Sequence, residues 1–146
     1  MSNAARPIEI LLVDDDSGDV LLLMEALREN NLSNTLRVVK DGVEAMAYLR
    51  RESSYEDAVR PDVVLLDLNL PRKDGREVLA DMKQDPALRG IPVVILTTST
   101  SEADIVCAYD LQANLYVNKP VDLDEFLGIV KEIDRFFTKV VRLPSR

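Results

Sequence analysis

The sequence has 146 residues, the length of one domain, and 47% of them are hydrophobic while 30% are charged. These proportions are typical of a globular protein and exclude an intrinsically disordered chain. The sequence contains no histidine and one cysteine, Cys107. Catalytic triads that use histidine and zinc sites that use histidine are therefore excluded, and any metal has to be a hard cation held by oxygen atoms.

The charge is strongly acidic, with 26 Asp and Glu against 18 Lys and Arg and a net charge of −8. Such a chain repels the phosphates of nucleic acids, and three Phe with four Tyr offer little for base stacking. The longest uncharged stretch, Ile91 to Ser101, is much shorter than the roughly 20 apolar residues that cross a membrane. A lone cysteine favours a reducing compartment. We therefore expect a cytoplasmic protein that binds neither nucleic acid nor membrane.

Short aliphatic runs alternate with helical patterns along the chain. The expected strands are Ile8–Val13, Leu36–Val39, Asp62–Leu66, Val93–Leu96 and Leu115–Val117. The expected helices are Val20–Glu29, Val43–Arg51, Arg76–Lys83, Glu102–Leu111 and Leu123–Lys139. Several of the strands are apolar throughout, which is typical of strands that are covered on both faces.

This alternation predicts right-handed crossovers onto one parallel sheet. The expected fold is a doubly wound α/β domain with five strands in the flavodoxin-like order 2-1-3-4-5 and five helices. A single domain over residues 6–146 is expected, because the sequence shows no internal repeat or linker. Two segments exceed what this fold requires, the loop Glu52–Pro61 and the C-terminal continuation Phe136–Leu143.

The last expected helix carries two apolar stripes. The first is formed by Leu123, Phe126, Leu127, Val130 and Phe137, and the second by Ile129, Ile133, Phe136 and Val140. One stripe packs on the sheet, so the second is expected to be exposed in a monomer. We therefore expect a homodimer through this helix. The alternative is that the tail Val141–Leu143 folds back and covers the second stripe.

Polar residues follow all five expected strands, but Lys40-Asp41-Gly42 after Leu36–Val39 is typical of a plain turn. The polar residues after the other four strands are Asp14-Asp15-Asp16, Asp67, Thr97-Thr98-Ser99 and Asn118-Lys119-Pro120. Each aspartate alone is explained by helix capping or by solvation of a loop. The polar residues gain meaning as a group, because the carboxyl ends of parallel strands meet at one edge of the sheet, where ligands bind. The sequence therefore predicts a pocket of three carboxylates, a hydroxyl and an ammonium group.

Carboxylates crowded in this way repel one another unless a cation joins them, and oxygen donors suit Mg²⁺. Lys119 and Thr97 would then supply donors to an anion beside the metal, which indicates a phosphoryl group. The five glycines form neither of the glycine-rich nucleotide-binding loops. We therefore expect a phosphoryl group without a bound nucleotide.

Five motifs occur in a recognisable order. They are Val13-Asp14-Asp15, Leu65-Leu66-Asp67-Leu68-Asn69-Leu70-Pro71, Asp74-Gly75, Leu96-Thr97-Thr98 and Tyr116-Val117-Asn118-Lys119-Pro120. With these motifs the sequence resembles the receiver domain of bacterial two-component response regulators. The resemblance extends from about Ile8 to Phe137.

The resemblance implies a role for each matching position. Asp67 is the implied phosphoacceptor, which takes a phosphoryl group from a phosphohistidine of a sensor histidine kinase. Asp14, Asp15, Asp67 and the main-chain carbonyl of Asn69 are the implied ligands of Mg²⁺, with Asp14 acting largely through water. Thr97 and Lys119 are implied to bind the phosphoryl oxygens. Such a chain is a phosphoacceptor that assists its own phosphorylation and dephosphorylation, and not an enzyme with a separate substrate.

The resemblance also implies a way of signalling. Thr97 would move toward the phosphoryl group, and Tyr116 would change rotamer to fill the gap. These movements would re-form the face around the fourth helix, the fifth strand and the fifth helix, which would signal by protein contact. The loop Glu52–Pro61 and the C-terminal tail resemble those of the stand-alone regulators that partner bacterial phytochrome kinases, so a phytochrome-type kinase is an implied partner.

Two other classes of protein compete with this interpretation. One is a haloacid-dehalogenase-like phosphatase in which Asp14 is the nucleophile and Asp16 the acid/base, but Asp67 precedes Thr97 and Lys119, against the motif order of that family. The other is a receiver-like binding module that never takes phosphate, but its usual signature is the loss of the acceptor or of the acidic pair. The sequence leaves open the cognate kinase, the downstream target, the phosphate lifetime and whether the Lys119-Pro120 bond is cis.

Overall fold

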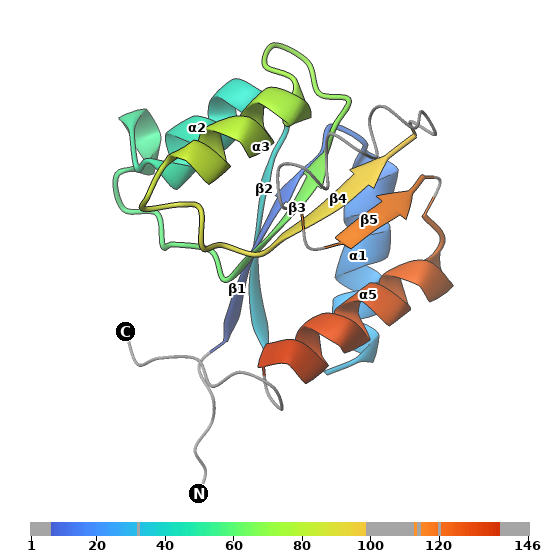
Figure 1. Cartoon of the computed structure of the whole chain (residues 1–146). Coiled ribbons are helices and arrows are strands. Elements are labelled where there is room, and N and C mark those ends of the chain that lie inside the picture. Colours follow the sequence, from blue (N-terminus) through green and yellow to red (C-terminus); the bar gives the residue numbers. More distant parts are fainter. Residues whose placement is uncertain (1–6, 32, 99–112, 114, 120, 138–146) are drawn as a thin grey trace, which may run out of the picture.

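Five parallel strands form one sheet in the order β2-β1-β3-β4-β5 in the computed structural model (Figure 1). The structure describes residues 7–31, 33–98, 113, 115–119 and 121–137. The strands are β1 (Ile8–Val13), β2 (Asn34–Val39), β3 (Val63–Asp67), β4 (Val93–Thr97) and β5 (Leu115–Asn118). The predicted fold class and strand order are confirmed. Phosphoacceptor candidate Asp67 is the last residue of β3, one residue beyond the predicted end of that strand.

Helices cover both faces of the sheet. They are α1 (Ser17–Glu29), α2 (Gly42–Leu49), α3 (Gly75–Gln84) and α5 (Leu123–Arg135). α1 and α5 cover one face, and α2 and α3 cover the other (Figure 1). The helix predicted at Glu102–Leu111 lies outside the described residues. Within the described part of the chain, none of the helices has the length and apolar character needed to cross a membrane.

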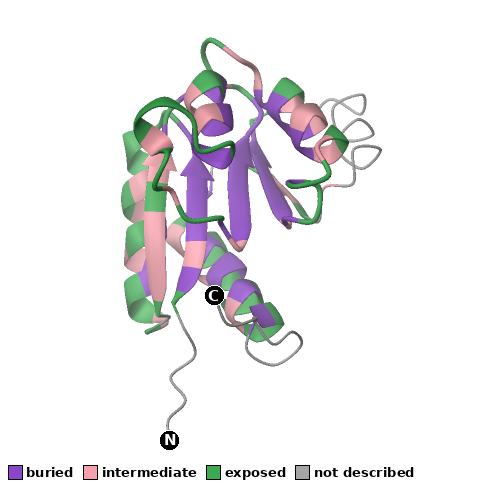
Figure 2. Ribbon diagram, turned by 90° about the vertical axis from the view of Figure 1, so that its left-hand side faces the viewer, coloured by how far each residue is buried: buried purple, intermediate pink, exposed green. Residues whose placement is uncertain are grey.

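The hydrophobic core is divided by the sheet into two halves. Leu11 and Val13 of β1 belong to the half under α2 and α3, and Ile10 and Leu12 belong to the half under α1 and α5. This alternation follows from the period of two of a β-strand. All residues of β3 and β4 are buried (Figure 2), which explains why these strands are apolar up to their last residue.

An aspartate caps the start of each described α-helix. The four N-caps are Asp16 for α1, Asp41 for α2, Asp74 for α3 and Asp122 for α5. Their carboxylates accept hydrogen bonds from main-chain N–H groups that have no partner inside the helix. α1, α2 and α3 therefore begin one to three residues before their predicted starts, directly after the capping aspartate.

The burial of α5 differs from the sequence prediction. Ile129 and Ile133 of the second apolar stripe were expected to be exposed in a monomer, but only 6% and 5% of their surfaces are accessible. The prediction is wrong for these two residues because α5 packs against α1 as well as the sheet, so the buried arc of the helix is wider than one stripe. Phe136 remains exposed at 41%, and Val140 and the tail Val141–Leu143 lie outside the described residues.

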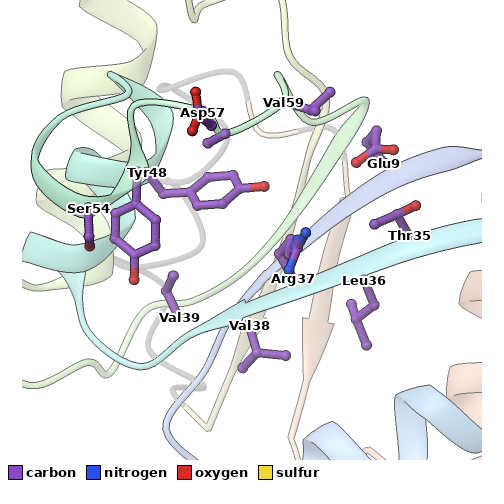
Figure 3. A pocket seen from close by; sticks show the side chains of 12 residues that line it. Glu9, Thr35, Leu36, Arg37, Val38, Val39, Tyr48, Ser54, Asp57 and Val59 are labelled. Carbon is purple, nitrogen blue, oxygen red and sulfur yellow. The ribbon is translucent and has the colours of Figure 1, made fainter.

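The loop Glu52–Pro61 begins with a 3₁₀ turn, Ser53–Tyr55. The Tyr55 hydroxyl donates a hydrogen bond of 2.5 Å to Glu44 of α2, which raises the pKa of Tyr55 to about 12. The rings of Tyr48 and Tyr55 meet edge to face with centroids 5.3 Å apart. These contacts fix the loop to α2, and a cavity of about 580 Å³ lies between this loop and β2 (Figure 3).

A glycine at the start of α3 allows that helix to approach the end of β3. A Cβ atom on Gly75 would lie 2.2 Å from the main-chain oxygen of Asp67 and 2.6 Å from the Cα of Leu68. Both distances are far below van der Waals contact. The position of the Asp67 backbone therefore depends on the absence of a side chain at residue 75.

Gly75→Ala is expected to lower the free energy of unfolding by about 1–3 kcal/mol, because the added methyl group forces the backbone of α3 and β3 apart. The matched control is Gly128→Ala in α5, where a Cβ meets no atom within 4 Å. That variant is expected to raise the free energy of unfolding by about 0.5–1 kcal/mol, because alanine is the better helix former. Urea unfolding monitored by circular dichroism measures both changes. Equal effects of the two substitutions would contradict the close approach.

Candidate functional site

The predicted polar residues converge at the carboxyl edge of the sheet. Strand register places the ends of the three strands concerned side by side, because Val13 pairs with Leu66 and Asp67 with Leu96. Asp14 directly follows β1, Asp67 ends β3 and Thr97 ends β4. Lys119 follows β5, and its main-chain N–H donates a hydrogen bond of 2.7 Å to the carbonyl of Thr97. The fold therefore assembles the site from four separate parts of the chain.

The ammonium group of Lys119 lies at the centre of this site. Its Nζ is 2.9 Å from Asp67 Oδ2, 3.0 Å from Asp14 Oδ2 and 2.5 Å from Asp19 Oδ2. The side chain of Lys119 is only 8% exposed, and those of its three partners are no more than 10% exposed. A buried charge is tolerated when opposite charges compensate it, and here one cation is shared among three anions.

Burial and the shared cation have opposing effects on the carboxyl groups. Burial raises the pKa of Asp14 to about 7, although the main-chain N–H of Asp16 and the ammonium of Lys119 oppose this shift. Burial also raises the pKa of Asp67, against the hydrogen bonds that Lys119 and the main-chain N–H of Asn69 donate. One ammonium group therefore compensates the surrounding carboxylates incompletely.

The pKa of Lys119 moves in the direction expected for a surrounded cation. Burial lowers this pKa, but the hydrogen bonds to Asp19, Asp67 and Asp14 outweigh that effect and raise the pKa above its ordinary value. Lys119 is therefore fully charged at physiological pH and acts as a fixed positive charge.

The acidic residues fit a divalent cation. Asp14, Asp15 and Asp67 each offer a carboxylate oxygen, and these atoms all lie within 4.8 Å of one another. Asp14 and Asp67 are buried while Asp15 is exposed, so the cluster is open to solvent on the side of Asp15. Donors that are all oxygen atoms and carry this much negative charge suit Mg²⁺. The incomplete compensation of the carboxylates provides the electrostatic reason for such an ion.

Both oxygen atoms of the Asp67 carboxylate are held in place. Oδ2 accepts the hydrogen bond from Lys119, and Oδ1 accepts one of 2.8 Å from the main-chain N–H of Asn69. The residue itself is only 4% exposed. Its orientation is therefore set by one charged and one main-chain donor, as is useful for a nucleophile that must attack along one direction.

The side chain of Asn69 connects this loop to the end of β4. Its amide nitrogen donates hydrogen bonds of 3.1 Å to Thr97 Oγ1 and 3.0 Å to Thr98 Oγ1. The sequence predicted a role only for the main-chain carbonyl of Asn69, and these side-chain contacts were missed. Thr97 is completely buried, so its hydroxyl is positioned by the strand end and by Asn69.

Tyr116 of β5 lies further along the sheet than the carboxylates. It pairs in register with Ile95, two residues before Thr97, and it packs as a partly buried residue against the core under α2 and α3. The rotamer change implied for Tyr116 by the resemblance stays a prediction.

Asp16 has a structural task that accounts for its side chain. Its Oδ1 accepts hydrogen bonds from the main-chain N–H groups of Gly18 and Asp19, at 2.8 and 3.4 Å. It is exposed and caps α1. The phosphatase alternative requires Asp16 as an acid/base, and a capping carboxylate that faces solvent does not favour that role.

Asp19 was not predicted as a site residue. It belongs to the first turn of α1, where an acidic residue is expected simply because it favours the helix N-terminus. The signal available in the sequence is its spacing, because Asp19 stands four residues before the buried Leu23 and therefore on the same helix face. A carboxylate on the buried face of a helix requires a partner, and Lys119 is that partner.

The cavity in Figure 3 is separate from the carboxylate cluster. Its lining consists of Glu9, Thr35, Leu36, Arg37, Val38, Val39, Tyr48, Ser54, Tyr55, Asp57, Ala58 and Val59. Among the described residues, none that lines this cavity belongs to the acidic site.

The sheet order and the acidic site define a receiver domain. Residues 10–131 match the family described as response regulator receiver domain. The chain belongs to this family.

Relatives with similar sequences support the same classification. The response regulator Rcp1 of Synechocystis sp. is 44% identical over 99% of this chain and 99% of its own length. The probable methanogenesis regulatory protein FilR2 of Methanothrix harundinacea is 38% identical over 97% of this chain and 91% of its own.

Solved structures of similar fold include two regulators of cyanobacterial type. The phosphorylated cyanobacterial phytochrome response regulator RcpA has a TM-score of 0.84 and 50% identity, and the match covers 95% of this chain and 99% of RcpA. The Mn²⁺-bound form of Rcp1 has a TM-score of 0.84 and 45% identity, covering 95% of this chain and all of Rcp1. The fold predicted from the sequence is therefore shared with these regulators.

Proposed function

We propose that this chain is a response regulator of a phosphorelay that accepts a phosphoryl group on Asp67 from a partner histidine kinase. The observation that supports this proposal most strongly is the fixed orientation of the Asp67 carboxylate, which Lys119 and the main-chain N–H of Asn69 hold. This carboxylate lies at the edge of the sheet beside Asp14 and Asp15. The similarity to a phosphorylated RcpA supports this function. Asp67 is then an acceptor that promotes its own phosphorylation, and not an enzyme site for a separate substrate.

The proposed reaction is an in-line phosphoryl transfer. A carboxylate oxygen of Asp67 forms a bond to phosphorus while the bond between phosphorus and the histidine nitrogen of the donor breaks. The electron pair of the broken bond stays on the imidazole nitrogen, which takes a proton. Because this chain contains no histidine, a phosphohistidine donor has to belong to a partner, and the product on Asp67 is an acyl phosphate.

The residues around Asp67 neutralise and orient the phosphoryl oxygens. Lys119 supplies a fixed positive charge, and the buried hydroxyl of Thr97 supplies a neutral donor on the adjacent strand. Asp14, Asp15, Asp67 and the main-chain carbonyl of Asn69 would hold Mg²⁺, for which the Mn²⁺-bound Rcp1 provides support. When bound, such a cation stabilises the negative charge that collects on the transferring group.

Phosphorylation is proposed to act on the face that includes β5 and α5. Thr97 and Tyr116 lie on neighbouring strands, with Ile95 in register with Tyr116, so movement of the threonine toward a phosphoryl group changes the packing next to the aromatic ring. A shift of the population from 1:99 to 99:1 requires about 5.5 kcal/mol in favour of the active state. The signal would leave the domain through protein contact.

The cytoplasm is the compartment that we propose for this protein. The partner kinase is proposed to be of phytochrome type, because RcpA is a phytochrome response regulator.

The test of the acceptor is incubation with Mg²⁺ and acetyl phosphate, followed by peptide mass spectrometry to locate the phosphoryl adduct. The expected adduct is on Asp67, because that carboxylate is the one held by both Lys119 and Asn69, and Asp67→Asn should abolish it. An adduct on Asp14 would instead support the phosphatase. A chain without any adduct would support the binding module and overturn the proposal.

We also propose a homodimer through the C-terminal part of α5. The support is an exposed apolar surface around Phe136 and Leu115, each 41% exposed, which line one apolar cavity of about 390 Å³. The buried Ile129 and Ile133 reduce the size of this surface relative to the sequence prediction, so the interface would depend mainly on Phe136.

Light scattering tests the dimer. The wild type is expected to have the mass of a dimer, and Phe136→Asp with Val140→Asp the mass of a monomer, because carboxylates cannot be desolvated in an apolar interface. Val43→Asp is the matched control, since Val43 is 43% exposed but lies on α2, on the other face of the sheet. Equal masses for the wild type and the double variant would contradict the proposed dimer.

A further inference from the structure

Lys119 has one more partner than the proposed reaction uses. Its three N–H bonds face three carboxylates, and the shortest contact, 2.5 Å, is to Asp19. Asp19 is not among the carboxylates close enough together to share a cation, which in the described residues are Asp14, Asp15 and Asp67. Its contact with Lys119 therefore needs an explanation other than metal binding.

The reaction changes two of the three contacts of Lys119. Asp67 turns from a carboxylate into an acyl phosphate, whose new oxygen atoms take the ammonium donor. A divalent cation held by Asp14, Asp15 and Asp67 would compete with Lys119 for the charge of Asp14. Asp19 is the one partner that the chemistry leaves unchanged.

We propose that Asp19 is a positioning residue that anchors the Lys119 ammonium throughout phosphorylation. This inference rests on the proposed function, and it assigns to α1 a part in the reaction. With one N–H bond held by Asp19, the remaining donors of Lys119 are directed at the phosphoryl group.

The location of Asp19 suits an anchor. The main-chain N–H of Asp19 donates to the capping carboxylate of Asp16, and Leu23, one turn later in α1, is completely buried. The backbone of Asp19 is therefore held within the packed helix α1. Lys119, in contrast, follows the last residue of β5 and has a long side chain with many rotamers. Fixing a lysine side chain in advance avoids an entropy loss during the reaction.

The burial of Asp19 excludes a role limited to the surface. The residue is 7% exposed, and its Oδ2 lies 2.5 Å from the Lys119 ammonium. The ion pair with Lys119 is thus what compensates this carboxylate. A residue that only improved the start of a helix would not need to be buried against a lysine.

The test is the rate of Asp67 phosphorylation by acetyl phosphate, with Mg²⁺ raised to saturation separately for each variant. Asp19→Ala is expected to slow the reaction about tenfold, because Lys119 loses its fixed orientation. Glu125→Ala is the matched control. Glu125 is also an acidic residue in the first turn of a helix and is exposed, so its removal should leave the rate within about twofold of the wild type.

A double-mutant cycle with Lys119→Ala separates positioning from a general structural effect. If Asp19 acts through Lys119, Asp19→Ala causes no further loss of rate once Lys119 has been removed. Losses that multiply in the double variant, or an Asp19→Ala rate within about twofold of the wild type, would overturn the inference.

Asp19→Asn provides a second variant in case Asp19→Ala does not fold. It keeps the size and one acceptor oxygen but removes the charge, so a smaller slowing in the same direction is expected. A wild-type rate for Asp19→Asn would contradict the anchor. A wild type that takes no phosphoryl group would instead overturn the proposed function, and this inference with it.

Discussion

The site depends on one buried ammonium group placed among several carboxylates. Lys119 contacts Asp14, Asp19 and Asp67 within 3.0 Å, and the pKa of Asp14 nevertheless rises to about 7 because burial outweighs this compensation. Removing one partner of such a group leaves a buried charge without its counterpart, which is strongly destabilising. The same shortage of positive charge makes the edge of the sheet suited to a divalent cation, and such a cation would reduce the repulsion of an anionic phosphoryl group.

The parallel sheet brings these charges together and keeps other aspartates out of the site. Asp14 and Asp67 continue directly from buried strands, whereas Asp16, Asp41, Asp74 and Asp122 stand one position before a helix and cap it. Two aspartates that are only two residues apart, Asp14 and Asp16, therefore have different functions. These aspartates therefore fall into two groups, one that caps helices and one that forms the charged cluster.

Sequence patterns predicted the sheet order and the four strand ends that form the site, because apolar strands and the polar residues after them are local signals. They did not predict the contact of Asp19 with Lys119, since an acidic residue in a first helical turn is ordinary and the partner lies 100 residues away along the chain. They also failed for Ile129 and Ile133, because the pattern of a helix shows which faces are apolar but not how many neighbours it has. Here α5 packs against both α1 and the sheet.

The most direct test of the central claim is the free energy of unfolding in chelator and in excess Mg²⁺, measured from about pH 5 to about pH 8. The raised pKa of Asp14 means that the folded chain binds more protons than the unfolded chain between about pH 4 and 7, so stability in chelator should fall by a few kcal/mol as the pH rises. Asp14→Asn should remove most of this fall, and Mg²⁺ should stabilise the wild type more at pH 8 than at pH 5, because protons compete with the cation. A wild type that is equally stable across this range in chelator, and that gains the same stability from Mg²⁺ at both ends, would contradict the account.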